Sequence, residues 1–266
     1  MHRVRIPAGM QEGERLILQK AEAHYVANVL RLRKGDEVQA FDGAGHAFRL
    51  RLLTVCPAMV EGQLIATLPS WKEEGLQIVL GQGVSKGAKM DLIVEKCSEL
   101  GLTTLVPVYT ERTVVRDTGR EAAKLARWRR VAASAARQCG RRVFLDLQPS
   151  VTWQDFCITY RCAPVKIVCW EEEQTRGLRQ VLEGLAGQSP VVVLIGPEGG
   201  LTPSEVAVAQ SHGFISVNLG PHRLRSETAA IAMTSIIRYS LGELEPRREK
   251  DGYTGGERSY EGAGDW

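Results

Sequence analysis

The chain has 266 residues, of which 44% are hydrophobic and 24% charged, and its formal net charge is +3. This is the composition of a globular protein with enough chain for one large domain or two smaller ones. The small net charge does not by itself indicate a nucleic-acid-binding protein, because the distribution of basic residues matters more than their total.

Several classes of protein are disfavoured by local patterns. No apolar run approaches the roughly 20 residues that a membrane-spanning helix needs, and the first ten residues lack the apolar segment of a secretory signal. The six cysteines form no Cys-x-x-Cys pair and have no histidine at metal-ligand spacing. Free thiols in a reducing compartment are therefore favoured over disulfides or zinc. We expect a cytoplasmic protein without a membrane segment or a metal.

Residues 1–70 predict a small β-rich module. Short alternating segments separated by turn residues predict strands at 3–6, 15–19, 37–41, 46–55 and 60–67. One helix is expected at 21–30, with an apolar face made of Tyr25, Val26, Val29 and Leu30. Strands at such short intervals are typical of a small barrel, and residues 68–70 are the expected linker.

From residue 76 the pattern changes to alternating strands and helices. Strands are expected at 76–81 and 105–109, with an amphipathic helix at 88–100 between them. The inward residues of this helix are expected to be Met90, Ile93, Val94, Cys97 and Leu100. Gly81, Gly83 and Gly87 resemble a dinucleotide-binding fingerprint, but the third glycine is displaced and the expected acidic residue is missing. We reject that interpretation.

A basic helix is expected next. Thr118 and Glu121 have the spacing of a capping box, and the helix runs to about Cys139. Its apolar stripe contains Leu125, Trp128, Ala132, Ala135 and Cys139. The basic residues around it are Lys124, Arg127, Arg129, Arg130, Arg137, Arg141 and Arg142. They form either a solvated face or a surface for RNA phosphates, and we favour the second for part of them.

Three buried strands follow, at 165–170, 191–195 and 215–219. Each ends in a loop, and a capping box of Thr202 and Glu205 begins a helix with Pro203 at its first position. Ser226 is the expected N-cap of a last helix, at 227–241. In open α/β sheets the loops after such strands meet at one edge, where small ligands bind.

At this point the ordered motifs resemble a known family. They read IGPEGGLTPSE at 195–205, LGPHRLRSETA at 219–229, SKGAKMD at 85–91, KCSELG at 96–101, YTER at 109–112 and QCGR at 138–141, with HYV at 24–26 and VLR at 29–31. This set is similar to the RsmE family of SPOUT-type methyltransferases, which methylate N3 of a uridine in 16S ribosomal RNA. The resemblance covers roughly residues 1–245.

The resemblance implies an architecture and partners. We expect an α/β fold with a SPOUT-type parallel sheet, a C-terminal trefoil knot and a small N-terminal PUA-like β-barrel. The domains would be a PUA-like RNA-binding barrel at 1–70, a methyltransferase domain at 71–245 and a flexible tail at 246–266. The last helix is apolar on more than one side, and the family implies that it packs in a homodimer. The other expected partner is 16S rRNA or the small ribosomal subunit.

The family also implies S-adenosyl-L-methionine as the cofactor, held largely by backbone groups of the strand-end loops. The expected cofactor-binding residues are Trp170, Ile195, Gly196, Pro197, Gly199, Gly200, Leu219, Gly220, Leu224, Ser226, Thr228 and Ala229. No metal is needed, because the methyl donor is already activated as a sulfonium. Tight turns alone would demand some of the same glycines.

Catalysis must deal with the proton on uracil N3 and the charge that its loss creates. Arg225 is the candidate that stabilises charge on O2 or O4 and orients a base flipped out of the RNA. Glu227 either accepts a proton, fixes Arg225 or only favours the helix N-terminus, and Glu198 is the third catalytic candidate. His222 stands where family members usually carry arginine. The expected RNA contacts are Arg3, Arg31, Arg33, Lys86, Lys89, Arg141 and Arg223.

Two alternative functions stay open. One is a non-catalytic RNA-binding or ribosome-assembly protein with a degenerate methyltransferase domain, which the intact loops at 196–200 and 225–228 disfavour. The other is a SPOUT methyltransferase that acts on another RNA site, such as tRNA or a 2′-hydroxyl. The residues do not identify the general base, nor whether free RNA or the assembled subunit is the substrate.

Overall fold

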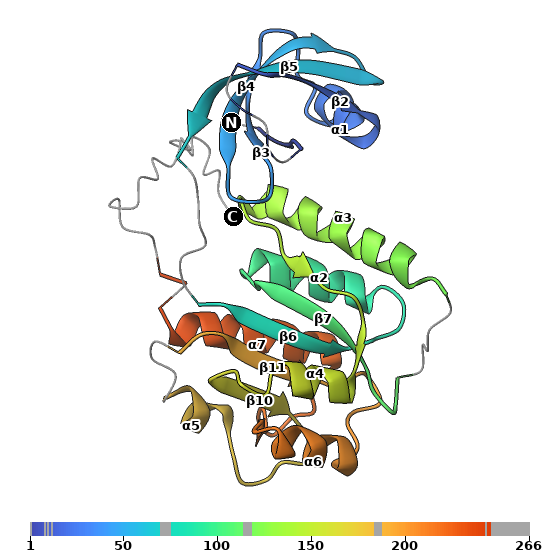
Figure 1. Ribbon diagram of the computed structural model, residues 1–266, viewed down its shortest axis with the longest axis vertical. Helices are drawn as coiled ribbons and strands as arrows, with labels where there is room; N and C mark the ends of the chain where they lie inside the picture. The colour runs from blue at the N-terminus through green and yellow to red at the C-terminus, as the bar shows by residue number, and fades with distance from the viewer. Residues whose placement is uncertain are drawn as a thin grey trace, which may run out of the picture. The chain divides into compact units, whose positions relative to one another are not determined.

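The computed structural model describes residues 2–7, 9, 11, 13–69, 76–113, 119–183, 188–242 and 244–245. The described residues fall into two compact units (Figure 1), the first holding those up to 69 together with Glu245 and the second those from 76 to 244. Among these residues no helix is long and apolar enough to cross a membrane, and no group of His, Cys, Asp or Glu side chains is arranged to hold a metal ion.

The first unit is built on a five-stranded sheet. Its strands are β1 (Arg3–Arg5), β2 (Arg15–Gln19), β3 (Glu37–Phe41), β4 (Ala47–Val55) and β5 (Met59–Leu68). They follow the order β1-β3-β4-β5-β2, with β1 parallel to β3 and the other neighbours antiparallel. Leu16 and Leu18 are buried under this sheet whereas Ile17 between them is 56% exposed, which is the alternation of a sheet with one covered face.

The helix expected at 21–30 is interrupted. The chain forms a short α1 (Lys20–His24) and then a π-helical turn, η1 (Tyr25–Val29), in which the Leu30 N–H donates to Tyr25 O at 2.9 Å. A π turn contains one more residue than an α turn and rotates the following side chains about the axis. Val26 is therefore fully buried, whereas Val29 is 60% exposed. The prediction that Val29 lies on the apolar face is wrong.

The second unit is built on a parallel sheet. Its strands are β6 (Ile78–Gly83), β7 (Thr104–Tyr109), β8 (Asp146–Leu147), β9 (Val151–Thr152), β10 (Val165–Cys169), β11 (Val191–Ile195) and β12 (Ile215–Val217). The order is β12-β10-β11-β6-β7-β8, and β9 extends the pairing along β7. All of these pairs are parallel, so the carboxyl ends of the strands lie at one edge, as expected.

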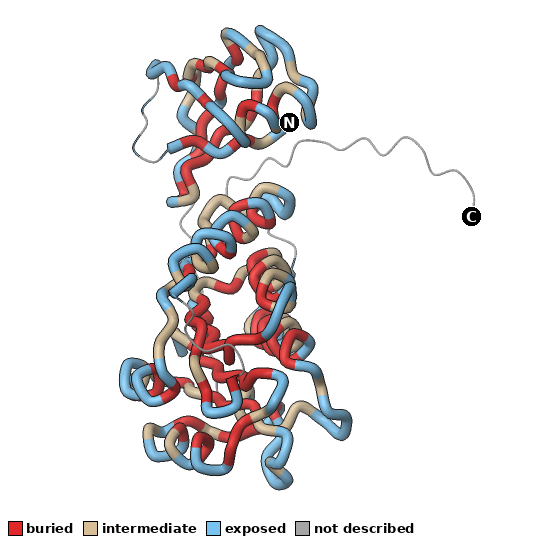
Figure 2. Tube along the Cα trace, turned by 90° about the vertical axis from the view of Figure 1, so that its right-hand side faces the viewer, coloured by how far each residue is buried: buried red, intermediate tan, exposed pale blue. Residues whose placement is uncertain are grey.

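Helices cover both faces of this sheet (Figure 1). They are α2 (Lys89–Glu99), α3 (Glu121–Cys139), α4 (Trp153–Thr159), α5 (Leu178–Leu182), α6 (Pro203–Ser211) and α7 (Ser226–Ser240). Val191, Val193 and Ile195 pack into one core with α2, α3 and α7, whereas Val192 and Leu194 pack into another with α4 and α6. Burial on both faces explains why β11 is a continuous apolar run, and Figure 2 shows the buried strands at the centre of the unit.

Helix starts were predicted with mixed success. The box at 202–205 is confirmed: Thr202 Oγ1 accepts from Glu205 N–H at 3.2 Å, and Glu205 Oε2 accepts from Thr202 N–H at 2.9 Å. Thr118, the N-cap expected for α3, lies outside the described residues. The helix begins at Glu121 with Arg120 as N-cap, and the Glu121 carboxylate accepts a hydrogen bond from the Tyr109 hydroxyl instead.

Gly83, from the rejected fingerprint, has a packing role. It ends β6, and a Cβ at this position would lie 2.4 Å from the backbone nitrogen of Pro197. Such a distance is far below van der Waals contact, so any side chain would push β6 away from the loop that follows β11. The glycine is thus explained by a close approach of two backbone segments.

We predict that Gly83→Ala lowers the free energy of unfolding by about 1–3 kcal/mol, because the added methyl collides with a buried backbone that has no room to move. Gly177→Ala is the matched control, since a Cβ there meets no atom within 4 Å. Gly177 is the N-cap of α5. The loss of free energy of unfolding in Gly177→Ala should therefore stay below about 1 kcal/mol, the scale of a helix N-cap preference. Urea unfolding followed by circular dichroism measures both, and equal losses would contradict the close approach.

Candidate active site

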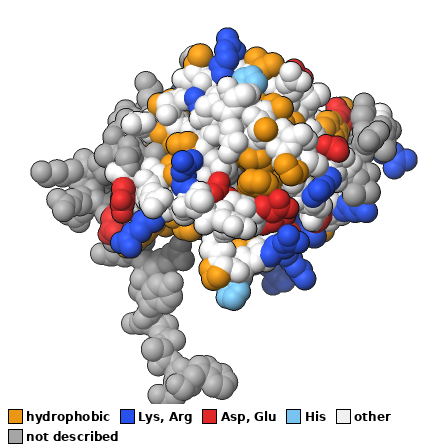
Figure 3. All heavy atoms as spheres, turned by 90° about the horizontal axis from the view of Figure 1, so that it is seen from below, with side chains coloured by type: hydrophobic (Ala, Val, Ile, Leu, Met, Phe, Trp, Pro, Cys, Tyr) orange, Lys and Arg blue, Asp and Glu red, His pale blue; other side chains and the backbone are white. Residues whose placement is uncertain are grey.

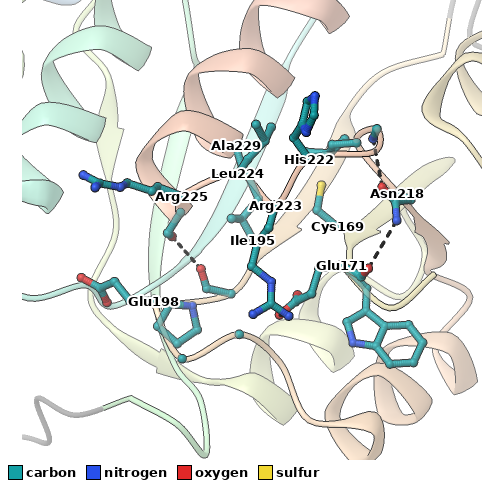
Figure 4. A pocket seen from close by; sticks show the side chains of 18 of the residues that line it. Cys169, Glu171, Ile195, Glu198, Asn218, His222, Arg223, Leu224, Arg225 and Ala229 are labelled. Carbon is teal, nitrogen blue, oxygen red and sulfur yellow. Dashed lines mark hydrogen bonds and ion pairs between the residues drawn. The ribbon is translucent and has the colours of Figure 1, made fainter. Parts of the chain in front are cut away.

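A pocket of about 750 Å³ opens at the carboxyl edge of the parallel sheet. Its walls are the loops after β10, β11 and β12 and the first turn of α7 (Figure 4). The lining residues are Lys89, 169–171, 195–200, 218–226 and Ala229. The pocket therefore lies where the three strand–loop units were expected to meet, and its size is that of a small-molecule site.

Most of the predicted cofactor residues are brought together here. The lining includes Trp170, Ile195, Gly196, Pro197, Gly199, Gly200, Leu219, Gly220, Leu224, Ser226 and Ala229. Thr228 is exposed on α7 and does not belong to the lining. Of the catalytic candidates, Arg225 and Glu198 line the pocket, whereas Glu227 is buried beside it.

Ser226 ties the pocket walls together. Its hydroxyl donates to Gly196 O at 2.6 Å and accepts from Gln82 Nε2 at 2.8 Å. Gln82 is fully buried in β6, so three segments meet at this hydroxyl: the central strand, the loop after β11 and the start of α7. Ser226 is not the N-cap that we predicted, since Arg225 occupies that position in extended conformation. The serine side chain bonds across the fold instead of capping its own helix.

Asn218 joins the loops after β10 and β12. Its amide nitrogen donates to Glu173 O at 2.7 Å and to Glu171 O at 3.3 Å, and its amide oxygen accepts from Gly220 N–H at 2.9 Å. A second contact between the same two loops is an ion pair, in which an Arg223 guanidinium nitrogen lies 3.8 Å from Glu171 Oε1. These contacts fix the two loops against each other across the pocket (Figure 4).

The third loop is held from the side of β7. Arg112 Nη1 donates to Gly199 O at 3.0 Å, and Glu111 N–H donates to the buried Glu205 carboxylate at 2.8 Å. Both residues belong to the YTER segment that the resemblance singled out. Their contribution is thus to hold the backbone of 199–205 in place from outside the pocket.

One end of the pocket carries a charged cluster of Lys89, Glu198 and Glu227. Lys89 Nζ lies 3.1 Å from Glu198 Oε1 and 3.8 Å from Glu227 Oε2, and the Lys86 N–H donates to Glu198 at 3.1 Å. Partial burial raises the pKa of Glu198, but hydrogen bonds from its own N–H, the Lys89 ammonium and the Lys86 N–H outweigh it, so the pKa is lowered overall. Glu198 is therefore a weak candidate for a general base.

Two further lining residues are neutral. Burial raises the pKa of the Cys169 thiol to about 12, so this side chain forms part of the wall and is no nucleophile. Among the described residues Trp170 Nε1 is shielded from solvent and has no hydrogen-bond partner. A buried donor of this kind is matched when a ligand supplies an acceptor.

The predicted RNA contacts are scattered. Lys89 and Arg223 line the pocket, Lys86 is exposed next to it, and Arg141 donates to Ser98 O at the end of α2. In the first unit Arg31 and Arg33 are exposed. Arg3 stacks over the Phe41 ring, 4.8 Å from its centroid. On the face of the molecule shown in Figure 3, basic and acidic side chains are interspersed, without one large patch of either sign.

Sequence reasoning missed Gln82, Asn218, Glu171 and Cys169. Cys169 and Asn218 each lie one residue before the end of a predicted strand, so their position near the edge of the sheet was a usable signal. Gln82 was passed over with the rejected fingerprint, and its bond to Ser226 joins residues 144 positions apart. Such long-range partners leave no local pattern in a single sequence.

Family models match both parts of the chain. Residues 72–238 match an RNA methyltransferase domain, and residues 18–54 match an RNA methyltransferase PUA domain. Ribosomal RNA small subunit methyltransferase E of Synechocystis is 32% identical over 222 residues, which cover 82% of this chain and 71% of that protein. The Bacillus subtilis protein of the same name is 28% identical, with 82% and 87% covered.

Solved structures give the same result. A Legionella pneumophila protein in complex with S-adenosylmethionine superimposes with a TM-score of 0.83 at 30% identity, covering 90% of this chain and 97% of that one. Ribosomal RNA small subunit methyltransferase E from Neisseria gonorrhoeae, also bound to S-adenosyl methionine, has a TM-score of 0.81 at 29% identity, with 92% and 100% covered. The chain therefore belongs to the ribosomal RNA small subunit methyltransferase E family, the RsmE family whose motifs its sequence carries.

Proposed function

We propose that this protein transfers a methyl group from S-adenosylmethionine to N3 of a uridine in the 16S rRNA of the small ribosomal subunit. The observation that carries the proposal is the pocket at the carboxyl edge of the parallel sheet, whose three loops contain nearly all predicted cofactor residues. Family membership supports the reaction class.

The residues of the pocket suit S-adenosylmethionine. Ile195, Leu219 and Leu224 give the wall an apolar stretch for a flat ring, whereas the backbone of the loops offers polar contacts. Gly200 has a φ of +72°, a backbone conformation that residues with a side chain rarely adopt, so this position in the loop favours glycine. When bound, the cofactor supplies a methyl group on a positively charged sulfur, and no metal is required.

Arg225 is the proposed catalytic residue. It lines the pocket as the N-cap of α7, and among the described residues it takes part in no ion pair. Its guanidinium is therefore available to a uracil carbonyl. By stabilising negative charge on O2 or O4, it makes the N3 proton easier to lose and the nitrogen a better nucleophile.

The two glutamates are proposed to support this site without taking the proton. Glu198 is held by the Lys86 N–H and by Lys89, and its lowered pKa makes it a poor acceptor. Glu227 is only 8% exposed and does not line the pocket. Its nearest charged partner is Lys89. In this proposal the N3 proton of the uracil is lost to solvent. The role of the two glutamates is to orient the charged cluster of Lys89, Glu198 and Glu227.

The finer architecture is also proposed. The first unit, at 1–70, would bind RNA through Arg31 and Arg33, and residues 71–245 would form the catalytic domain. The insertion of β11 between β10 and β6 fits a chain threaded into a trefoil knot. Ile236 and Tyr239 on α7 are 39% and 71% exposed, as a homodimer contact would require. Because the substrate is ribosomal RNA, the protein would act in the cytoplasm.

The reaction is tested with labelled S-adenosylmethionine and small subunits from a strain that lacks this gene, followed by nucleoside analysis. We expect N3-methyluridine as the product. Free 16S rRNA assayed in parallel shows which form is the substrate. Label in another nucleoside would agree with a methyltransferase but refute N3 of uridine as the target. Binding of the donor without any transfer would favour the non-catalytic alternative.

In the same assay we predict that Arg225→Ala lowers kcat by about 10²–10³-fold, the usual effect of removing one group that stabilises developing charge. Donor affinity should change little, because the guanidinium is assigned to the base. Arg179→Ala is the control, since the side chain of this arginine on α5 is 93% exposed and, among the described residues, forms an ion pair only with Glu183. A loss of donor binding equal to the loss of rate would contradict the assignment.

Ser226→Ala is predicted to weaken donor binding about tenfold, because the loop at Gly196 loses its hydrogen bond and the buried Gln82 amide loses one of its two acceptors, the other being Gly83 O. Thr228→Ala is the matched control on the same helix, two positions away and outside the lining. Isothermal titration calorimetry measures both. If Thr228→Ala weakened binding as much as Ser226→Ala, the proposed arrangement would be wrong.

A further inference from the structure

The charged end of the pocket contains two carboxylates and two basic groups. Glu198, Lys89 and Arg225 line it, and Glu227 lies two residues beyond Arg225 on α7. Figure 4 shows the Arg225 and Glu198 side chains at the same end of the pocket. A guanidinium that can reach a carboxylate ordinarily forms an ion pair with it, often a bidentate one. Here the carboxylates are paired with the lysine instead.

The geometry of that pairing is unequal on the two sides. Lys89 Nζ is 3.1 Å from Glu198 Oε1 but 3.8 Å from Glu227 Oε2, and within the described residues Glu227 Oε2 is buried without a hydrogen-bond partner. The side chains of Lys89, Glu198 and Glu227 are 35%, 31% and 10% exposed. The single ammonium thus lies between the two carboxylates in a partly desolvated place, where unpaired charge is costly, and it balances one of their two negative charges.

We propose that Lys89 is a positioning residue: it occupies Glu198 and Glu227, and so leaves the Arg225 guanidinium available to the substrate base. Without the ammonium, the strongest nearby cation for the two carboxylates is Arg225. An ion pair between Arg225 and these carboxylates would neutralise the guanidinium and orient it away from the substrate base. The inference rests on the proposed function for its catalytic consequence, but the electrostatic arrangement exists without any substrate.

Two readouts test this role. Phenylglyoxal modifies the neutral form of an arginine, and an ion pair with a carboxylate stabilises the protonated form. The modification rate of Arg225, followed by peptide mass spectrometry on the protein without donor or RNA, therefore reports whether this side chain is paired. Arg179 serves as the internal reference, since it is distant in sequence and 93% exposed. The second readout is kcat and the donor KM in the methyl-transfer assay.

Four proteins are compared: wild type, Lys89→Met, the triple variant Lys89→Met/Glu198→Gln/Glu227→Gln, and Lys96→Met. Lys96 is a matched control on the same helix, because it also bridges two carboxylates, Glu95 at 2.8 Å and Glu99 at 3.0 Å, but does not line the pocket. Thermal unfolding of all four shows whether a variant has lost its fold.

For Lys89→Met we expect Arg225 modification to slow severalfold and kcat to fall about tenfold or more, with the donor KM nearly unchanged. The triple variant should recover the modification rate and most of kcat, because no carboxylate is then left to pair with Arg225, and a merely structural role would not produce this reversal. Lys96→Met should match the wild type. Unchanged modification in Lys89→Met, or no recovery in the triple variant, would overturn the inference. If the modification follows this pattern while the wild type transfers no methyl group, the proposed function fails and the positioning role stands.

Discussion

The site depends on a single buried hydroxyl. Ser226 Oγ receives a hydrogen bond from Gln82 in the central strand and gives one to the carbonyl of Gly196. Because the residues involved are buried, water cannot replace either partner without a cost. This contact joins the start of α7, and with it Arg225, to the central strand and to the loop after β11, while the apolar face of α7 packs against the sheet.

The parallel sheet gives the loops their common location. Every strand pair in the second unit is parallel, so β10, β11 and β12 all end at one edge. Apolar side chains on both faces of β11 lock the strand between two helical layers. The loops themselves are then fixed by polar links, such as Asn218 across two of them and Arg112 from the side of β7. A rigid apolar scaffold and a few long-range hydrogen bonds together shape the pocket.

Much of this could be read from the sequence because the signals are local. The β-branched run at β11 and the capping box at Thr202 specify their elements within a few residues, and both were predicted at their observed positions. The pocket followed from the rule that such strand ends share an edge. Family motifs then identified the reaction class, which no composition or spacing would have given.

The failures have physical reasons. Val29 is exposed because a π turn adds a residue to the helix, which an α-helical periodicity cannot anticipate. Serine is a common N-cap residue, yet the Ser226 hydroxyl forms a hydrogen bond with Gln82, which is far away in the sequence. Lys89 is predicted from the sequence to contact an RNA phosphate, whereas in the structure its ammonium lies between the carboxylates of Glu198 and Glu227. Each case depends on tertiary neighbours that local residues do not encode.

The three strand-end loops and the start of α7 are proposed to hold the methyl donor. Hydrogen–deuterium exchange with and without S-adenosylmethionine is the measurement that tests this, because the proposed contacts are made largely by backbone groups of the loops. We predict slower exchange at 169–171, 195–200 and 218–226 on addition of the donor, and little change in β1–β5 or α3. Protection confined to the first unit or to α3, or no protection at saturating donor, would contradict it.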